Sequence, residues 1–163
     1  MKLSRSPLAL LLAAALVACG KDDHHADQNE HDQGHTHEPL FGGALTELGD
    51  HEANLEVALN AETGELTMYL LDGHATDTVR SAQETLAVTI EPAGGTAYAL
   101  TLGQVASPLS GEKVGDSSTY KIQDDRLKGV KDLDGKVASI AMLGTTYKDV
   151  AFAWPAGEHD HDH

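Results

Sequence analysis

Apolar and polar residues alternate in short runs throughout residues 40–155, and this period of two is what most constrains the fold. Successive side chains of a β-strand point to opposite faces, so alternation predicts strands with one buried face. Gly, Pro and Asp between the runs are typical of turns. The alternating runs are 55–59, 66–70, 86–90, 98–102, 140–142 and 150–154. This pattern predicts one all-β domain, a single antiparallel β-sandwich of immunoglobulin-like or similar kind.

The first two runs predict a hairpin whose register can be worked out. If residues 61–64 form the loop, with Gly64 supplying the positive φ that such a loop needs, residue 60 faces residue 65. The inward pairs are then Leu59 with Leu66, Val57 with Met68, and Leu55 with Leu70. A loop one residue longer or shorter would turn one apolar set to the wrong face. Continued outward, the same register places His51 opposite His74, both on the inward side.

His51 and His74 are therefore a candidate pair of metal ligands. Directly opposed residues have Cβ atoms roughly 5 Å apart, from which two imidazoles can bind one ion. Asp50, Glu52 and Asp72 are near in sequence and could orient the rings or complete the ligand set. The alternative is that one histidine caps a turn while the other closes the edge of the core.

The first nineteen residues predict a secretory signal peptide and a lipid anchor. Two basic residues precede an apolar run, 8–17, that is too short to span a bilayer as a stable helix. The last four of the nineteen residues, Leu16-Val17-Ala18-Cys19, resemble the bacterial lipobox. The resemblance implies that a signal peptide, 1–18, is removed and that Cys19 is lipidated. Lipoproteins of this type carry Asp in the next position when they are retained in the inner membrane, so with Gly20 there the resemblance implies an outer-membrane anchor facing the periplasm. The alternative is an ordinary signal peptide that contains a cysteine.

Two segments flank the domain and hold most of the ten histidines. Residues 20–39, which follow the lipidated Cys19 in the tether 19–39, contain no Val, Ile, Leu, Phe, Tyr or Trp, so we expect them to be disordered. We expect the tail 156–163 to be mobile as well. Their histidines are His24, His25, His31, His35, His37, His159, His161 and His163. Neutral imidazole suits zinc, copper(II) and nickel, so these tails predict metal capture; the alternative is a solvated spacer.

Charge and motifs exclude several other classes of function. A formal net charge of −15 argues against nucleic acid as a partner, because phosphate binding needs clustered Lys and Arg. A single cysteine excludes an intrachain disulfide framework. The tripeptide Gly115-Asp116-Ser117 resembles the nucleophile motif of some serine hydrolases, but its flanking residues do not match. With no phosphate-binding loop and no metalloprotease motif, we expect a protein that is not an enzyme.

Residues 41–79 resemble a β-rich module at the N-terminal, periplasmic end of metal-efflux membrane-fusion (adaptor) proteins. The residues that carry the resemblance are Gly42-Gly43, Glu47-Leu48-Gly49, His51, Asn54-Leu55-Glu56, Tyr69-Leu70-Leu71-Asp72 and His74-Ala75. In the module a histidine often precedes the Gly-Gly pair, whereas here Leu40-Phe41 separates that pair from His37-Glu38-Pro39. The chain lacks the helical hairpin and lipoyl-like parts of an adaptor, so the resemblance implies a protein that donates or buffers metal.

Together these patterns predict a monomeric, lipid-anchored protein on the periplasmic face of the outer membrane. We expect it to bind zinc, copper(II) or nickel for capture, buffering or delivery to metal-efflux components. The alternative function is a lipid-anchored interaction module, in which the β-domain binds a protein or glycan and the His-rich tails are spacers.

Overall fold

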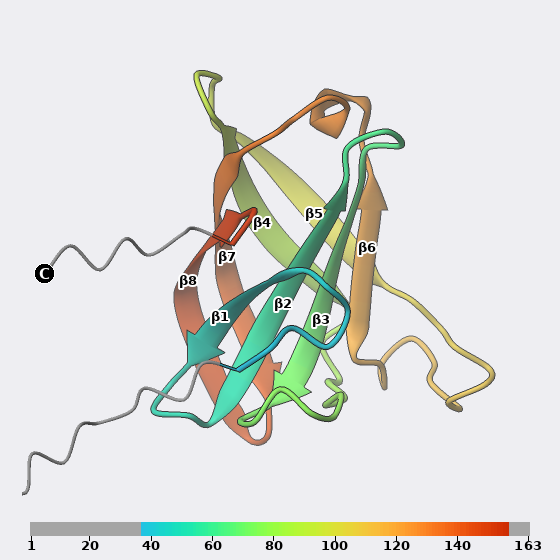
Figure 1. Ribbon diagram of the computed structural model, residues 1–163. Coiled ribbons are helices and arrows are strands. Elements are labelled where there is room, and N and C mark those ends of the chain that lie inside the picture. Colours follow the sequence, from blue (N-terminus) through green and yellow to red (C-terminus); the bar gives the residue numbers. More distant parts are fainter. Residues whose placement is uncertain (1–36, 157–163) are drawn as a thin grey trace, which may run out of the picture. The chain divides into compact units, whose positions relative to one another are not determined.

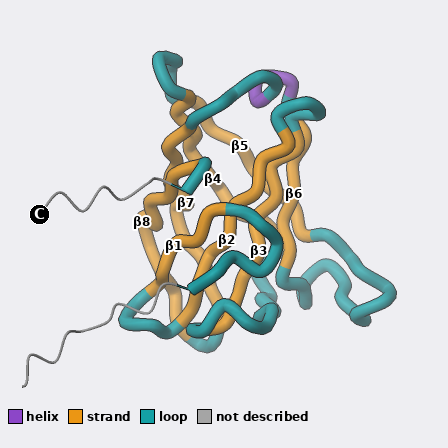
Figure 2. Tube along the Cα trace, in the orientation of Figure 1, coloured by secondary structure: helices purple, strands orange, loops and turns teal. Residues whose placement is uncertain are grey.

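The computed structural model describes residues 37–156, and its regular structure there is β-strand apart from one turn of 3-10 helix, Asp125–Leu127 (Figure 2). The strands are β1 (Ala44–Leu48), β2 (Ala53–Asn60), β3 (Glu65–Asp72), β4 (Thr85–Pro92), β5 (Tyr98–Gln104), β6 (Thr119–Gln123), β7 (Leu133–Met142) and β8 (Thr145–Trp154). Every neighbouring pair is antiparallel, so the all-β antiparallel prediction is confirmed. None of the described residues belongs to a helix long and apolar enough to cross a membrane.

The eight strands form one continuous sheet in the order β1-β2-β3-β6-β5-β4-β7-β8. Its weakest junction is β5 with β6, which are joined by only two residue pairs. The two edge strands, β1 and β8, contact each other, so the sheet curls around a single core (Figure 1). Because the pairing is continuous, the division into two separate sheets that a sandwich requires is not confirmed.

The β2–β3 hairpin has the predicted register. Asn60 pairs with Glu65, and the apolar pairs follow as expected: Leu59 with Leu66, Val57 with Met68, and Leu55 with Leu70. Gly64 has φ +75°, and the side-chain oxygen of Asn60 accepts hydrogen bonds from the loop amides of Glu62 and Thr63. All six apolar side chains of these pairs belong to the buried core, which confirms that the even-length loop fixes which face is inward.

Strand β2 is buried on both of its faces, which alternation alone does not predict. Its outer face is covered by residues 37–43, here called the strap, which crosses β2 and β3 before the chain turns back into β1 (Figure 1). The Phe41 ring of the strap stacks on Tyr69 of β3, with ring centres 4.0 Å apart and planes 17° apart. Under the strap lies Glu56, a fully buried carboxylate. The strap therefore belongs to the folded domain.

Candidate metal centre

Several predicted sites fall on residues that the structure does not describe. These are the lipidation site Cys19 and seven of the ten histidines, namely His24, His25, His31, His35, His159, His161 and His163. The three remaining histidines, His37, His51 and His74, all lie at one end of the sheet. This end is formed by the β1–β2 turn, the loop after β3 and the start of the strap (Figure 1).

His51 and His74 lie just beyond the end of the β2–β3 ladder. The last pair of the ladder is Ala53 with Asp72, so both histidines stand in turns. Both are exposed, and the prediction that they lie on the inward side is therefore wrong. The physical reason is the backbone of the turn: His51 has φ +54°, a left-handed conformation that ends the alternation of a strand.

The two turns are nevertheless packed tightly against each other. A Cβ at Gly73 would overlap the carbonyl oxygen of His51, so only glycine permits this approach of the two backbones. The buried Asn54 side chain donates hydrogen bonds to the carbonyl oxygens of Asp72, at 2.9 Å, and Gly73, at 3.2 Å. These contacts fix the residue before His74 relative to the backbone of His51. The hairpin thus brings both histidines to one corner of the domain, formed by residues 37–52 and 72–77, although not as a strand pair.

Asp72 shapes the loop that carries His74. Its carboxylate accepts hydrogen bonds from the Thr76 amide at 2.8 Å, the Asp77 amide at 3.1 Å and the Thr76 hydroxyl at 3.2 Å. Burial raises the pKa of Asp72, but the Asp77 and Thr76 hydrogen bonds outweigh burial and hold the pKa below its usual value. Both carboxylate oxygens are therefore engaged within the loop. Asp72 acts as a cap of this loop, and a role as metal ligand stays a prediction.

His37 reaches the same corner because the strap is anchored. The amides of Leu40, Phe41 and Gly43 donate hydrogen bonds of 2.7 to 3.1 Å to the Glu56 carboxylate. A buried carboxylate needs such partners, and here three backbone amides supply them. Residue 43 must be glycine, because a Cβ there would lie 2.5 Å from the Val57 carbonyl oxygen. The sequence assigned His37 to the tether, whereas the structure places it on the domain.

The three imidazoles converge with His37 in the middle. The ring centre of His37 is 6.2 Å from that of His51 and 6.0 Å from that of His74, and both contacts are edge-on. Two imidazoles bound to one tetrahedral zinc have ring centres about 5 Å apart, given Zn–N distances of about 2.0 Å. Movements of about 1 Å would therefore bring His37 to binding distance of either neighbouring ring. His51 and His74 each contact His37, and a site shared by all three requires these two rings to turn toward each other as well. The candidate donor set is three nitrogens from three separate segments.

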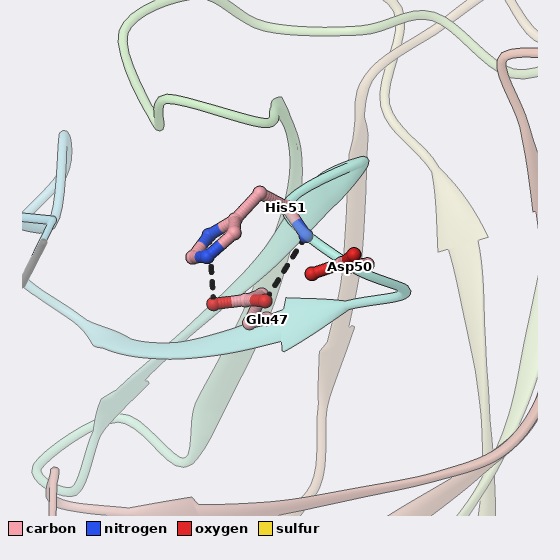
Figure 3. A group of neighbouring side chains, drawn as sticks. All are labelled: Glu47, Asp50 and His51. Atoms are coloured by element: carbon pink, nitrogen blue, oxygen red, sulfur yellow. Dashed lines mark hydrogen bonds and ion pairs between the residues drawn. The ribbon is translucent and has the colours of Figure 1, made fainter. Parts of the chain in front are cut away.

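Glu47 of β1 is the carboxylate that contacts a histidine of this group (Figure 3). One of its oxygens accepts a hydrogen bond from the His51 backbone amide at 3.1 Å, and the other lies 3.2 Å from the ring Nδ1. Glu47, Asp50 and His51 also form the one group of described residues whose ligand atoms all lie within 4.8 Å of one another. Glu52 instead accepts a hydrogen bond from the Tyr147 hydroxyl at 2.8 Å. Alternation gave no means of choosing Glu47 over Asp50 or Glu52.

The charge of this corner is uniformly negative apart from the histidines. Residues 37–52 and 72–77 contain six carboxylates and no Lys or Arg. The carboxylates are Glu38, Glu47, Asp50, Glu52, Asp72 and Asp77. A concentration of negative charge raises the local concentration of cations. The arrangement can therefore attract a divalent ion and offer it imidazole nitrogen.

The residues that resemble the adaptor module gather around this corner. Gly43 and Glu56 anchor the strap, Asn54 holds the loop after β3, and His51 and His74 belong to the group itself. No protein-family model, curated protein or solved structure matches the chain. The resemblance to the adaptor module therefore stays a prediction that rests on the residues alone.

Proposed function

We propose that this chain is a lipid-anchored periplasmic protein that binds transition-metal ions through His37, His51 and His74. The observation that carries the proposal is the convergence of three imidazoles, from the strap and two turns, within an acidic corner. Nitrogen donors favour zinc, copper(II) and nickel over calcium or magnesium. Zinc is the first candidate, because the site supplies three nitrogens and leaves a fourth tetrahedral position for water or a tail histidine.

The exposure of the group supports a role in capture, buffering or delivery. A structural zinc site is closed, whereas the His51 side chain keeps 53% of its surface exposed to solvent. An ion held in this way can be exchanged. The tail histidines would collect ions, the corner would hold one, and a metal-efflux component would receive it. The anchor at Cys19 and the outer membrane as its location belong to the same proposal.

The proposal treats the protein as a binding protein without catalytic activity. Ser117, the one candidate nucleophile, is fully buried, and its hydroxyl donates a hydrogen bond of 2.7 Å to the Val105 carbonyl oxygen. That bond supports a structural role in the loop. The finer description of the fold is also proposed: β1-β2-β3-β6 and β5-β4-β7-β8 act as the two layers of a sandwich, supported by the two-pair junction between β5 and β6.

Metal titrations of the full chain test the proposed site. The other seven histidines are first replaced by glutamine, so that the folded corner is the only source of imidazole. We expect this background to bind one zinc ion and His37→Ala, His51→Ala or His74→Ala each to weaken binding at least tenfold. Thr146→Ala, at an exposed position of β8, is the control and should not change affinity. Binding that survives all three histidine substitutions would refute the proposed site.

An interaction module is the second candidate function, and one observation favours it. Leu40 and Phe41 of the strap keep 44% and 46% of their surface exposed, and Leu109, in the loop between β5 and β6, is fully exposed. Exposed apolar side chains are typical of surfaces that contact a partner. If Leu109→Ser and Phe41→Ser abolish capture of a periplasmic protein or glycan that binds equally well without metal, the interaction module is the better description.

A further inference from the structure

We propose that Glu47 is a positioning residue that orients His51 and selects the ring nitrogen offered to the metal. This inference rests on the proposed function and adds a residue that does not itself touch the ion. Its basis is the two-point contact of one carboxylate with one histidine: the backbone amide of His51 at 3.1 Å and the ring Nδ1 at 3.2 Å (Figure 3).

The contact fixes which tautomer of His51 is favoured. An ionised carboxylate has only acceptors, so its position 3.2 Å from Nδ1 favours the tautomer that carries the hydrogen on that atom. In a neutral imidazole the other nitrogen, Nε2, then keeps its lone pair and is free to bind an ion. A carboxylate that holds a ligand histidine in this way also makes the bound nitrogen more basic.

The turn between β1 and β2 is built to make this contact. Gly49 has φ +69° and His51 has φ +54°, and these two left-handed residues turn the His51 amide back toward Glu47. The carboxylate therefore holds backbone and ring of one residue together, which restricts the side-chain rotamers of His51. Glu52 of the same turn is held by the Tyr147 hydroxyl at 2.8 Å. Glu47 and Glu52 thus carry the same charge close to each other, but Glu47 contacts His51 whereas Glu52 contacts Tyr147.

This difference supplies a matched control. The experiment uses the full chain with the other seven histidines replaced by glutamine, and zinc as the probe. We expect Glu47→Ala to weaken zinc binding about tenfold or more, the range found when the partner of a ligand histidine is removed. Glu52→Ala removes the same charge from the β1–β2 turn beside Glu47, so we expect it to change affinity no more than about twofold. An equal loss in both variants would show a general field effect and overturn the positioning role.

Two further measurements separate positioning from mere support of the fold. In a His51→Ala background, Glu47→Ala should have no further effect on zinc affinity, because the two residues act as a unit. Nitrogen-15 spectra of the imidazoles should show His51 with hydrogen on Nδ1 and zinc on Nε2, and a mixture of tautomers in metal-free Glu47→Ala. Zinc bound at Nδ1 would make Glu47 a direct ligand beside Asp50 and overturn the inference.

The outcome is distinguishable from failure of the proposed function. If His37→Ala and His74→Ala weaken zinc binding while Glu47→Ala does not, the three-histidine site stands and the positioning role of Glu47 falls. If neither histidine substitution has an effect, the proposed function itself fails.

Discussion

Replacement of Glu56 by glutamine should release the strap and weaken metal binding at the proposed site without changing a histidine. One oxygen of Glu56 accepts the Gly43 amide at 2.7 Å and the Phe41 amide at 2.9 Å, and the other accepts the Leu40 amide at 2.9 Å. Glutamine has only one acceptor oxygen, so its NH₂ group would face a backbone N–H. Each hydrogen bond lost from a buried charged group is worth about 1.5–3 kcal/mol.

The expected loss of stability follows from this count. At least one charge-assisted bond disappears and the others weaken, so Glu56→Gln should lower the free energy of unfolding by about 2–4 kcal/mol. Detachment of the strap limits the loss, because its amides can then bond to water. For a domain of this size the melting temperature should fall by about 10 °C. Zinc affinity should fall as well, since the strap carries His37.

Circular dichroism and amide hydrogen exchange would measure these effects. Exchange at Leu40, Phe41 and Gly43 should accelerate far more than exchange in β4 and β7, because the opening is local. Glu62→Gln is the control, since it makes the same change of charge at an exposed position of the β2–β3 loop. If Glu56→Gln has the same melting temperature as Glu62→Gln, and the three strap amides stay protected from exchange, the carboxylate does not anchor the strap and the reasoning is wrong.

Three further predictions concern the loop after β3 and the lipid anchor at Cys19. Gly73→Ala should separate the two turns, because its Cβ would overlap the His51 carbonyl oxygen, and zinc titration should show weaker binding. The pKa of Asp72 is lowered from 3.8, so its contribution to stability is present above that pH and is lost as pH falls through the lower folded value. Acid unfolding of Asp72→Asn should therefore show a smaller drop in stability below pH 3.8 than the unchanged chain. Cys19→Ala should move the protein from the membrane fraction to the soluble periplasm or leave it unprocessed, and an unchanged mass and fractionation would contradict lipidation.

The strands that sequence predicts well are those whose apolar residues repeat at least three times. The β2–β3 register followed from three apolar pairs and one loop length, because a slip of one residue would expose a whole apolar set. β1 and β6 were not predicted. They are five residues long, and only their neighbours in the sheet make them strands. β1 has three apolar residues, which do not alternate, and β6 has two, and so few on a short segment do not distinguish a strand from a loop.

The candidate site shows a different limit of prediction from sequence. His51 and His74 were paired from the hairpin register, yet the ladder ends at Ala53 and Asp72, and what brings the histidines together is the packing of two turns. Alternation describes a strand, and it carries no information once the backbone becomes left-handed. His37 was assigned to the tether because a segment without large apolar residues cannot build a core of its own.

A polar residue inside a strand is what links the strap to the site. Glu56 has outward parity in β2, where alternation predicts a solvated side chain, and it is instead fully buried. A carboxylate is buried only where donors compensate it, so its burial requires a second segment with free amides. The strap supplies them at Leu40, Phe41 and Gly43, and the same anchoring brings His37 within about 6 Å of two other imidazoles. Glu56→Gln and His37→Ala should therefore weaken metal binding in the same way, although only Glu56→Gln leaves all three imidazoles in the chain.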